Sequence, residues 1–239
     1  MLTKKWIPVA KRANLVGKEM NKPDGPLVAE LGGVWVTAGI LAGIIYYIAL
    51  NTFLLNQSSI NLFIFATLCT ILIIALIGFI DDILGWKIGL SQLQKPLLTI
   101  PAALSMMVIN AGYSYMSIPL FGDINFGILY PLLLVPIGIV GAANGFNMLA
   151  GYNGLEGGMG FVIISALSIV AYVKGESWVA MIGFVTAAAL IAFLIFNWFP
   201  AKIFPGNEFT YMLGAIMVCM AILGNMEKLA IVLFYTLLY

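Results

Sequence analysis

The chain has 239 residues, of which 62% are hydrophobic and only 9% are charged, and its mean hydropathy is +1.07. Soluble domains carry about 25% charged residues, so lipid must be the main solvent for this chain. The formal net charge is +1, so no strong overall field favours the binding of nucleic acid. The chain has no histidine, which excludes histidine–metal sites and serine–histidine catalysis and leaves carboxylates, amides, lysines or a bound metal for any chemistry.

Apolar stretches of membrane-spanning length follow one another along the chain. Residues 1–30 are basic and polar, lack the apolar core of a signal peptide and are predicted to form a cytoplasmic loop. A spanning helix needs about 20 mostly apolar residues. The sequence therefore predicts an all-α polytopic membrane protein, a single domain with a bundle of about seven transmembrane helices plus a partial one. The predicted helices lie near 31–55, 60–80, 93–112, 126–143, 158–173, 178–198 and 210–223, with the partial one near 229–239.

Two stretches depart from regular helix. Residues 113–125 have β-friendly side chains on both sides of a Gly–Asp pair, which predicts a small external β-hairpin. The stretch 126–143 contains Pro131 and Pro136, each of which removes a backbone donor, so a kink within protein surroundings is expected there.

The placement of lysine and arginine predicts the orientation of the bundle. With the N-terminus inside, nine basic residues fall on the inner side and two on the outer side. The inner set is Lys4, Lys5, Lys11, Arg12, Lys18, Lys22, Lys87, Lys95 and Lys202, and the outer set is Lys174 and Lys228. The inner loops are therefore expected to face the cytoplasm and to carry the chemistry.

The first two inner loops carry charged groups with alternative interpretations. Loop 17–33, GKEMNKPDGPLVAELGG, is either a solvated basic arm on anionic lipid or a loop that folds over an anionic ligand. Asp81 and Asp82 directly follow an apolar run, where they either end a helix or serve as a base, as metal ligands or as both. Lys95, at the start of the next helix, is placed to hold a phosphate.

The third inner loop, residues 141–160, is rich in amides and glycines. Asn144, Asn147 and Asn153 alternate with glycines, which let the backbone approach a ligand closely. The alternative is a turn-rich connection between two membrane helices. Asn144 and Asn147 lie three residues apart and share one face if that stretch is helical.

The fourth inner loop, residues 197–215, adds an aromatic side chain, Phe204, and a threonine, Thr210, placed to cap the next helix. A helix N-terminus favours an anion. Glu208 precedes that threonine by two residues. Carboxylates, amides, lysines and an aromatic ring on one face suit a phosphate-rich ligand with an oxygen-coordinated divalent cation such as magnesium.

These loops resemble a known family. IGFIDD, NGFNMLAGYNGLEGG, FPGNEFTYMLGA and the first loop are similar to motifs of the polyprenyl-phosphate N-acetylhexosamine-1-phosphate transferases of the glycosyltransferase 4 type, with the archaeal and eukaryotic dolichyl-phosphate branch nearest. The resemblance implies transfer of GlcNAc-1-phosphate from UDP-GlcNAc to a dolichyl or other polyprenyl phosphate with release of UMP, the first step of lipid-linked oligosaccharide assembly for N-glycosylation. It implies Mg2+ (or Mn2+) as cofactor, and it is compatible with a homodimer. It also implies a protein embedded in a lipid bilayer, either an archaeal cell membrane or an endoplasmic reticulum membrane, with the active face cytoplasmic.

The resemblance also implies roles for individual residues. The acidic pair lies near the lipid phosphate, either as a base or as a positioning group, because a phosphate monoester with a second pKa of about 6 is already largely ionised at neutral pH. The implied catalytic residues are Asp81, Asp82 and Lys95, the implied metal ligands are Asn147 and Asn207, and the implied substrate-binding residues are Met20, Glu30, Asn144, Gly151, Asn153, Glu156 and Phe204. Among these, Gly151 and Phe204 are expected to sandwich uracil, with Asn153 and the backbone near Met20 as its hydrogen-bonding groups.

Three departures from the family pattern are expected to matter. Asn207 stands where the family has a magnesium-binding aspartate, which removes a charge, and Glu208 is the nearest residue that could compensate. The chain begins inside the first inner loop, and it stops before the family's last helices and its last inner loop. A weakened or inactive relative that binds nucleotide sugar or lipid phosphate is therefore the alternative function. A transporter is disfavoured because the ionisable groups lie at the boundary and not at the midplane.

Overall fold

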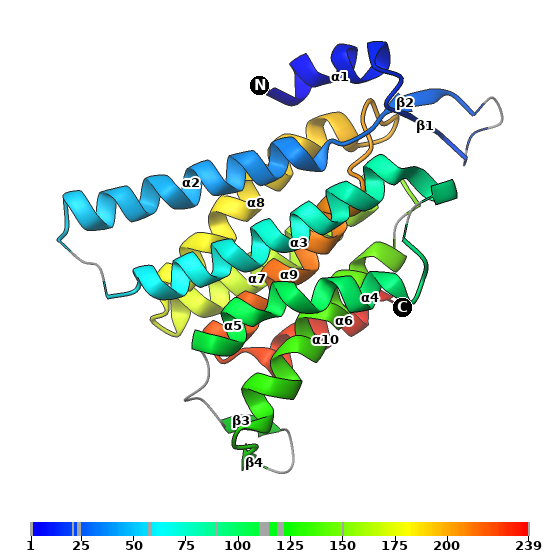
Figure 1. Ribbon diagram of the computed structural model, residues 1–239. Helices are drawn as coiled ribbons and strands as arrows, with labels where there is room; N and C mark the ends of the chain where they lie inside the picture. The colour runs from blue at the N-terminus through cyan, green and yellow to red at the C-terminus, as the bar shows by residue number, and fades with distance from the viewer. Residues whose placement is uncertain are drawn as a thin grey trace.

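The computed structural model describes residues 2–20, 22, 25–56, 59–88, 90–109, 115–118, 122–149 and 151–238. Within them the chain forms an all-α polytopic membrane bundle with two small β-hairpins (Figure 1). Five helices in this part of the chain are long and apolar enough to cross a membrane, and two shorter apolar helical segments accompany them. The predicted fold class is confirmed.

The long helices run side by side along the bundle (Figure 1). They are α2 (Gly33–Phe53), α3 (Asn61–Ile88), α7 (Leu155–Val173), α8 (Ser177–Asn197) and the span Tyr130–Met148, which combines a π-helical turn at Tyr130–Leu134 with α6 (Val135–Met148). The shorter segments are Gln94–Ile109, which comprises α4 (Gln94–Thr99), a 3-10 turn at Ile100–Ala103 and α5 (Leu104–Ile109), and α9 (Asn207–Leu223). The last helix is α10 (Glu227–Leu238). The part of the predicted helix 93–112 beyond residue 109 lies outside the described residues.

Prolines break the regular helices where the sequence predicted irregularity. Pro131 lies in the π-helical turn and Pro136 lies in the first turn of α6. The missing N–H groups thus fall where the helical hydrogen bonding already changes. Gly85 is the non-helical residue within α3, with φ 66° and ψ 168°, so the regular span of that helix ends beside the acidic pair.

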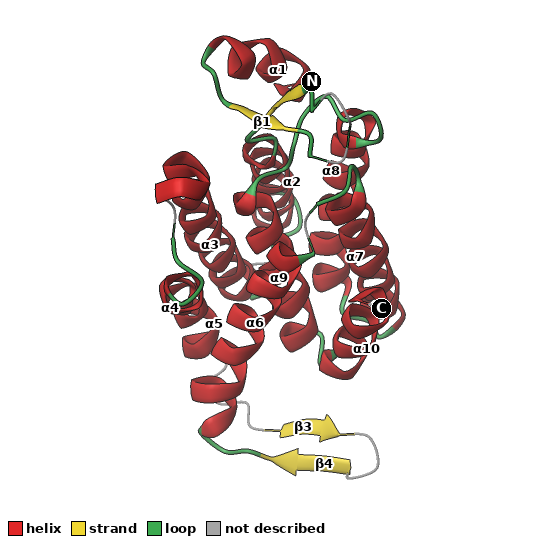
Figure 2. Cartoon of the chain, turned by 90° about the vertical axis from the view of Figure 1, so that its right-hand side faces the viewer, coloured by secondary structure: helices red, strands yellow, loops and turns green. Residues whose placement is uncertain are grey.

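Helix α9 forms the centre of the bundle. Seen from the end of the molecule, it lies among α2, α3, α6 and α7 (Figure 2). Nearly all of its residues are buried, from Glu208 to Ala221. Two glycines allow its neighbours to approach closely, because a Cβ at Gly78 of α3 would lie 2.5 Å from the Cα of Glu208, and one at Gly214 would lie 2.4 Å from the carbonyl oxygen of Ala142. This packing fixes the N-terminus of α9 against the end of α3.

The N-terminal segment is more ordered than the expected loop. Helix α1 (Leu2–Arg12) precedes an antiparallel hairpin of β1 (Val16–Lys18) and β2 (Leu27–Ala29). The indole of Trp6 donates to the carbonyl oxygen of Glu30 at 3.0 Å, and its ring lies 5.8 Å from that of Trp35. The prolines and glycines of this stretch predicted irregular structure. Helix α1 forms because Trp6 packs against Trp35, and such a contact between distant residues cannot be read from local sequence.

The predicted external hairpin is confirmed within the described residues. Strand β3 (Tyr115–Ile118) pairs antiparallel with β4 (Gly122–Asn125), with Ser117 opposite Asp123. The remainder of 113–125 lies outside the described residues. The hairpin projects from the bundle at a distance from the β1–β2 hairpin (Figures 1 and 2).

Candidate functional site

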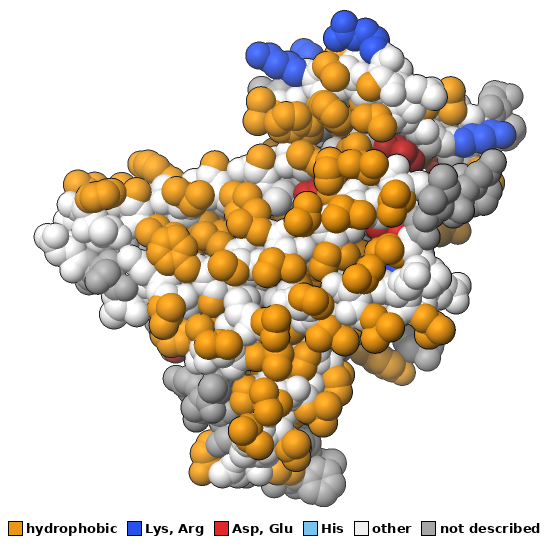
Figure 3. Space-filling model, in the orientation of Figure 1, with side chains coloured by type: hydrophobic (Ala, Val, Ile, Leu, Met, Phe, Trp, Pro, Cys, Tyr) orange, Lys and Arg blue, Asp and Glu red, His pale blue; other side chains and the backbone are white. Residues whose placement is uncertain are grey.

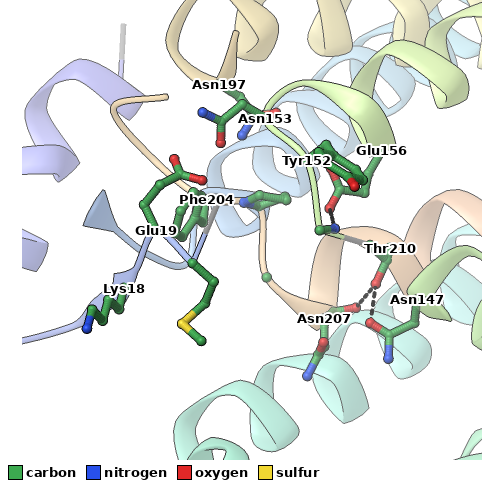
Figure 4. Close-up of a pocket in the computed structure, with 14 residues that line it drawn as sticks. Lys18, Glu19, Asn147, Tyr152, Asn153, Glu156, Asn197, Phe204, Asn207 and Thr210 are labelled. Carbon is green, nitrogen blue, oxygen red and sulfur yellow. Dashed lines mark hydrogen bonds between the residues drawn. The ribbon is translucent and has the colours of Figure 1, made fainter. Parts of the chain in front are cut away.

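A cavity of about 350 Å³ opens at the end of the bundle where α9 begins (Figure 4). It is bounded by the β1–β2 hairpin, the loop between α6 and α7, the loop between α8 and α9, and the first turn of α9. Its lining residues are Lys18, Glu19, Met20, Asn147, Gly151, Tyr152, Asn153, Glu156, Asn197, Phe204, Pro205, Gly206, Asn207 and Thr210. Segments that are far apart in sequence, and that the motifs singled out, thus share one cavity.

Asp81 is held by an ion pair and an amide at the edge of this cavity. Its Oδ2 lies 2.7 Å from Nζ of Lys95 and accepts a hydrogen bond from Nδ2 of Asn207 at 2.8 Å. Its Oδ1 accepts from the backbone N–H of Leu90 at 2.9 Å. The carboxylate is 3% exposed, so its charge is balanced mainly by Lys95. Asp81 therefore positions Lys95 and Asn207.

Asp82 caps α9. Its two carboxylate oxygens accept from the backbone N–H groups of Asn207 at 2.8 Å and Glu208 at 3.1 Å. Gly206 precedes them with φ 87°, and a Cβ there would lie 2.5 Å from Oδ2 of Asp82. The close approach of this carboxylate to the helix N-terminus thus requires glycine at position 206.

The structure corrects two expectations about α9. Thr210 does not cap the helix, because Asp82 does; its hydroxyl instead donates to Oδ1 of Asn147 and contacts the carbonyl oxygen of Asn207, both at 3.0 Å. Glu208 does not compensate for Asn207, because its Oε1 accepts from the hydroxyl of Thr37 on α2 at 2.6 Å, in the buried contact between the two helices. The adjacent side chains point in different directions, as expected for neighbours on a helix.

Asn144 and Asn147 lie on α6 but serve different surroundings. Asn147 lines the cavity and contacts α9 through Thr210. Asn144 donates to Oγ1 of Thr99 at 3.3 Å and to the carbonyl oxygen of Val140 at 2.8 Å, and it does not line the cavity. The structure therefore brings Asn147 to the site and places Asn144 in the contact with α4.

The other end of the cavity is shaped by a glycine loop and an aromatic ring. Gly151, with φ 151°, donates its N–H to Oε1 of Glu156 at 3.2 Å, which ties the loop to the first turn of α7. Phe204 is fixed by backbone hydrogen bonds, since its N–H donates to the carbonyl oxygen of Ala29 at 2.7 Å and its own carbonyl accepts from Gly32 at 3.0 Å. In Figure 4 Phe204, Asn153 and Glu19 lie toward one end, and Asn147 and Asn207 lie toward the other.

Asn197 is a site residue that the sequence did not reveal. It is 1% exposed, accepts from the N–H of Gly154 at 3.1 Å and donates to the carbonyl oxygen of Ile203 at 2.9 Å. It therefore joins the loop before α7 to the loop before α9. The only signal was an amide at the end of a long apolar run, and that run was assigned to a membrane helix.

Glu30 lies behind the cavity wall. A Cβ at Gly17 would contact both the carboxylate of Glu30 and the ring of Phe204, so these three residues are neighbours. Glu30 does not line the cavity itself. Burial raises the pKa of its carboxyl above the ordinary value of 4.5.

Oxygen atoms dominate the end of the cavity that could hold a metal. Within the described residues no group of three histidine, cysteine, aspartate or glutamate side chains is arranged to bind a metal ion. Asn147 and Asn207 offer amide oxygens, which suit Mg2+, while the carboxylates of Asp81 and Asp82 are engaged in the contacts above. The amide oxygens of these two residues fit a hard divalent cation, whose remaining ligands would have to come from elsewhere.

Comparisons with known proteins show which family the chain resembles. Residues 64–225 match the family described as "Glycosyl transferase family 4". A "Putative UDP-N-acetylglucosamine--dolichyl-phosphate N-acetylglucosaminephosphotransferase" of Saccharolobus solfataricus is 38% identical over 236 residues, which cover 98% of this chain and 70% of that protein. A Dictyostelium discoideum protein named "UDP-N-acetylglucosamine--dolichyl-phosphate N-acetylglucosaminephosphotransferase" is 28% identical over 287 residues, with 98% of this chain and 66% of that protein covered. A "Phospho-N-acetylmuramoyl-pentapeptide-transferase" of Bacillus licheniformis is 30% identical over 216 residues, covering 85% and 63%.

Proposed function

The chain belongs to glycosyl transferase family 4, and we propose that it transfers GlcNAc-1-phosphate from UDP-GlcNAc to a dolichyl or related polyprenyl phosphate. The observation that carries the proposal is 38% identity over 98% of the chain to a relative named for this reaction. The cavity lined by residues of the first, third and fourth inner loops supports it. It is a multi-pass membrane phosphotransferase.

In this reaction an oxygen of the lipid phosphate attacks the phosphorus that carries GlcNAc. A new P–O bond forms, the bridging P–O bond to UMP breaks, and UMP leaves with the bond electrons. The lipid phosphate is already largely ionised at neutral pH, its second pKa being about 6, so the residues act chiefly by positioning and by charge compensation. Lys95, oriented by Asp81, is the group we assign to the phosphates.

We assign the metal to the end of the cavity where Asn147 and Asn207 lie. Mg2+, or Mn2+, when bound there supplies charge neutralisation for the diphosphate. Asn147 and Asn207 would hold it through their amide oxygens. The contact of Thr210 with Asn147 keeps that oxygen at the cavity.

We assign the uridine to the opposite end. Phe204 and Gly151 lie on the cavity and suit the two sides of a uracil ring, because glycine leaves its face open and the aromatic ring stacks. Asn153 and the backbone near Met20 are proposed to form hydrogen bonds with the base. Glu156 contributes by holding Gly151, and Glu30 supports Phe204 from behind.

The location proposed for this site is the cytoplasmic face of an archaeal cell membrane or of an endoplasmic reticulum membrane. The support is the asymmetry of lysine and arginine, since the residues that form the cavity belong to the basic side. A homodimer remains an expectation that follows from the family.

A second function is favoured by one observation. The side chain of Asn207 is a neutral amide that donates to Asp81. A carboxylate at this position would give the metal end of the cavity one more negative charge. A relative that binds nucleotide sugar without efficient transfer is consistent with this arrangement.

Transfer of radiolabelled GlcNAc-1-phosphate from UDP-GlcNAc to a polyprenyl phosphate, measured in detergent with and without Mg2+, separates the two functions. Metal-dependent formation of lipid product with stoichiometric UMP supports the transferase. Binding of UDP-GlcNAc with neither product nor UMP refutes it and supports the binding relative.

A further inference from the structure

A second cavity lies on the same end of the molecule, outside the nucleotide cavity. It has a volume of about 420 Å³ and lies between α1, the β1–β2 hairpin and the turn that follows α8. Three of its lining side chains are lysines from three distant segments, Lys11, Lys22 and Lys202. Basic side chains gather over α1 and at the tip of the β1–β2 hairpin on the face that Figure 3 shows.

The positive charge of this cavity is largely uncompensated. Among the described residues Lys11 and Lys202 form no ion pair, and no acidic side chain belongs to the cavity lining. Lys22 is partly compensated, since its Nζ lies 3.4 Å from Oε2 of Glu19 and 4.9 Å from the centre of the Phe199 ring. Like charges around one cavity repel each other, and an anion in the cavity would relieve that repulsion.

The remaining walls of the cavity are apolar. Ile7 of α1, Leu27 of β2 and Pro200 line it, and Leu27 is 61% exposed. Lysines that surround an apolar floor fit an anion that also carries an apolar part. Leu2 and Val9 of α1 are also exposed and apolar, but they do not line the cavity.

The two cavities use different residues of one hairpin. Lys18, Glu19 and Met20 line the nucleotide cavity, whereas Lys22 and Leu27 line the second one. No lining residue is shared between them. A ligand of the second cavity is therefore separate from the donor nucleotide.

We propose that this second cavity, defined by Lys11, Lys22 and Lys202, binds a phosphate group, and that the group belongs to an anionic membrane lipid. The three lysines contact the phosphate, and Ile7, Leu27 and Pro200 contact the first carbons of the lipid. The apolar floor and the amphipathic α1 favour the lipid over free phosphate.

The test compares two double variants in the full chain. Lys11→Gln/Lys202→Gln removes two charges from the cavity, and Lys4→Gln/Lys5→Gln removes two charges from the same helix α1 outside the cavity lining. Retention of phosphatidylglycerol or phosphatidylcholine after delipidation is counted by native mass spectrometry. In a second arm, inorganic phosphate is titrated against the thermal unfolding temperature. Lys11→Arg/Lys202→Arg controls for side-chain size, because it keeps the charge.

A lysine near an anionic headgroup is worth about a fivefold change in affinity, so the cavity variant is expected to bind phosphatidylglycerol about twenty-five-fold more weakly and to retain less of it. The control on Lys4 and Lys5 and the arginine variant should retain it as the unchanged chain does. If inorganic phosphate stabilises the chain only when Lys11 and Lys202 are present, and phosphatidylglycerol is not retained, the cavity binds phosphate. That result would refute the proposal that the phosphate group belongs to a lipid. Equal retention by both double variants, or no binding of either probe, overturns the proposal.

Discussion

Replacement of Asn207 by aspartate tests the metal end of the cavity. The amide Nδ2 of Asn207 donates to Oδ2 of Asp81 at 2.8 Å, so Asn207→Asp places a second carboxylate against a first one that is 3% exposed. Two unit charges about 3 Å apart interact by about 5 kcal/mol at an effective dielectric constant of about 20. Lys95 lies 2.7 Å from the same oxygen and offsets part of that repulsion. A net cost of about 2–3 kcal/mol is expected without metal, in addition to the lost hydrogen bond.

The matched control is Asn207→Ala, which loses the same hydrogen bond without adding charge. In EDTA the aspartate variant should unfold about 5–10 °C below the alanine variant, because 1 kcal/mol shifts the transition of a chain this size by about 2–4 °C. Millimolar Mg2+ should recover that difference for aspartate only, since a cation between the two carboxylates removes their repulsion. Thermal unfolding in detergent measures both effects. Equal stability of the two variants in EDTA, or equal stabilisation of both by Mg2+, would refute the reasoning.

Three further predictions concern single side chains. Phe204→Ala should weaken UDP binding by about fivefold to 150-fold, because base stacking is worth about 1–3 kcal/mol. The Michaelis constant for the lipid should stay unchanged, and equal losses for both substrates argue against the assignment. Asp82→Asn keeps an oxygen that can cap α9, so turnover should fall with little loss of unfolding temperature. Asp82→Ala loses the cap as well and should lower the free energy of unfolding by about 1 kcal/mol. Unchanged turnover in both variants would remove Asp82 from the chemistry. Glu30→Gln should stabilise the fold more at pH 8 than at pH 4. A carboxyl whose pKa is raised by burial contributes stability below pH 4.5, and this contribution is lost as the pH rises. A pH-independent difference in unfolding temperature between the variant and the unchanged chain contradicts this.

Much of the bundle follows from the sequence because membrane solvent imposes a simple rule. Every span must satisfy its own backbone, so long apolar runs become helices, and the two prolines in the stretch 126–143 mark the irregular span. Helix α1 was not foreseen, since its order depends on Trp6 contacting Trp35 and Glu30, which are distant in sequence. Local propensity carries no information about such a partner.

Several members of the candidate site were predicted from the sequence, but their contacts were not. The motifs indicated that Asp81, Lys95 and Asn207 belong together, and the structure brings them into one hydrogen-bonded group. Which way each side chain points depends on helix rotation, so the same motifs could not show that Glu208 faces Thr37. They could not show Asn197 either, since its role lies in joining two loops that meet only in the fold.

The short central helix bears on the charge that the proposed phosphate-binding site would need. The N-terminus of α9 points at the cavity, and the N-terminus of a helix ordinarily attracts an anion. Here Asp82 occupies that position, because its carboxylate takes the N–H groups of Asn207 and Glu208. A negative side chain at the helix end repels a diphosphate. In the proposed reaction the compensating positive charge would come from Lys95 and from a divalent cation that Asn147 would help to hold. The capping contact thus orders the start of α9 and, through the same carboxylate, opposes the binding of an anion there, which is the physical reason to include a cation in the proposed function.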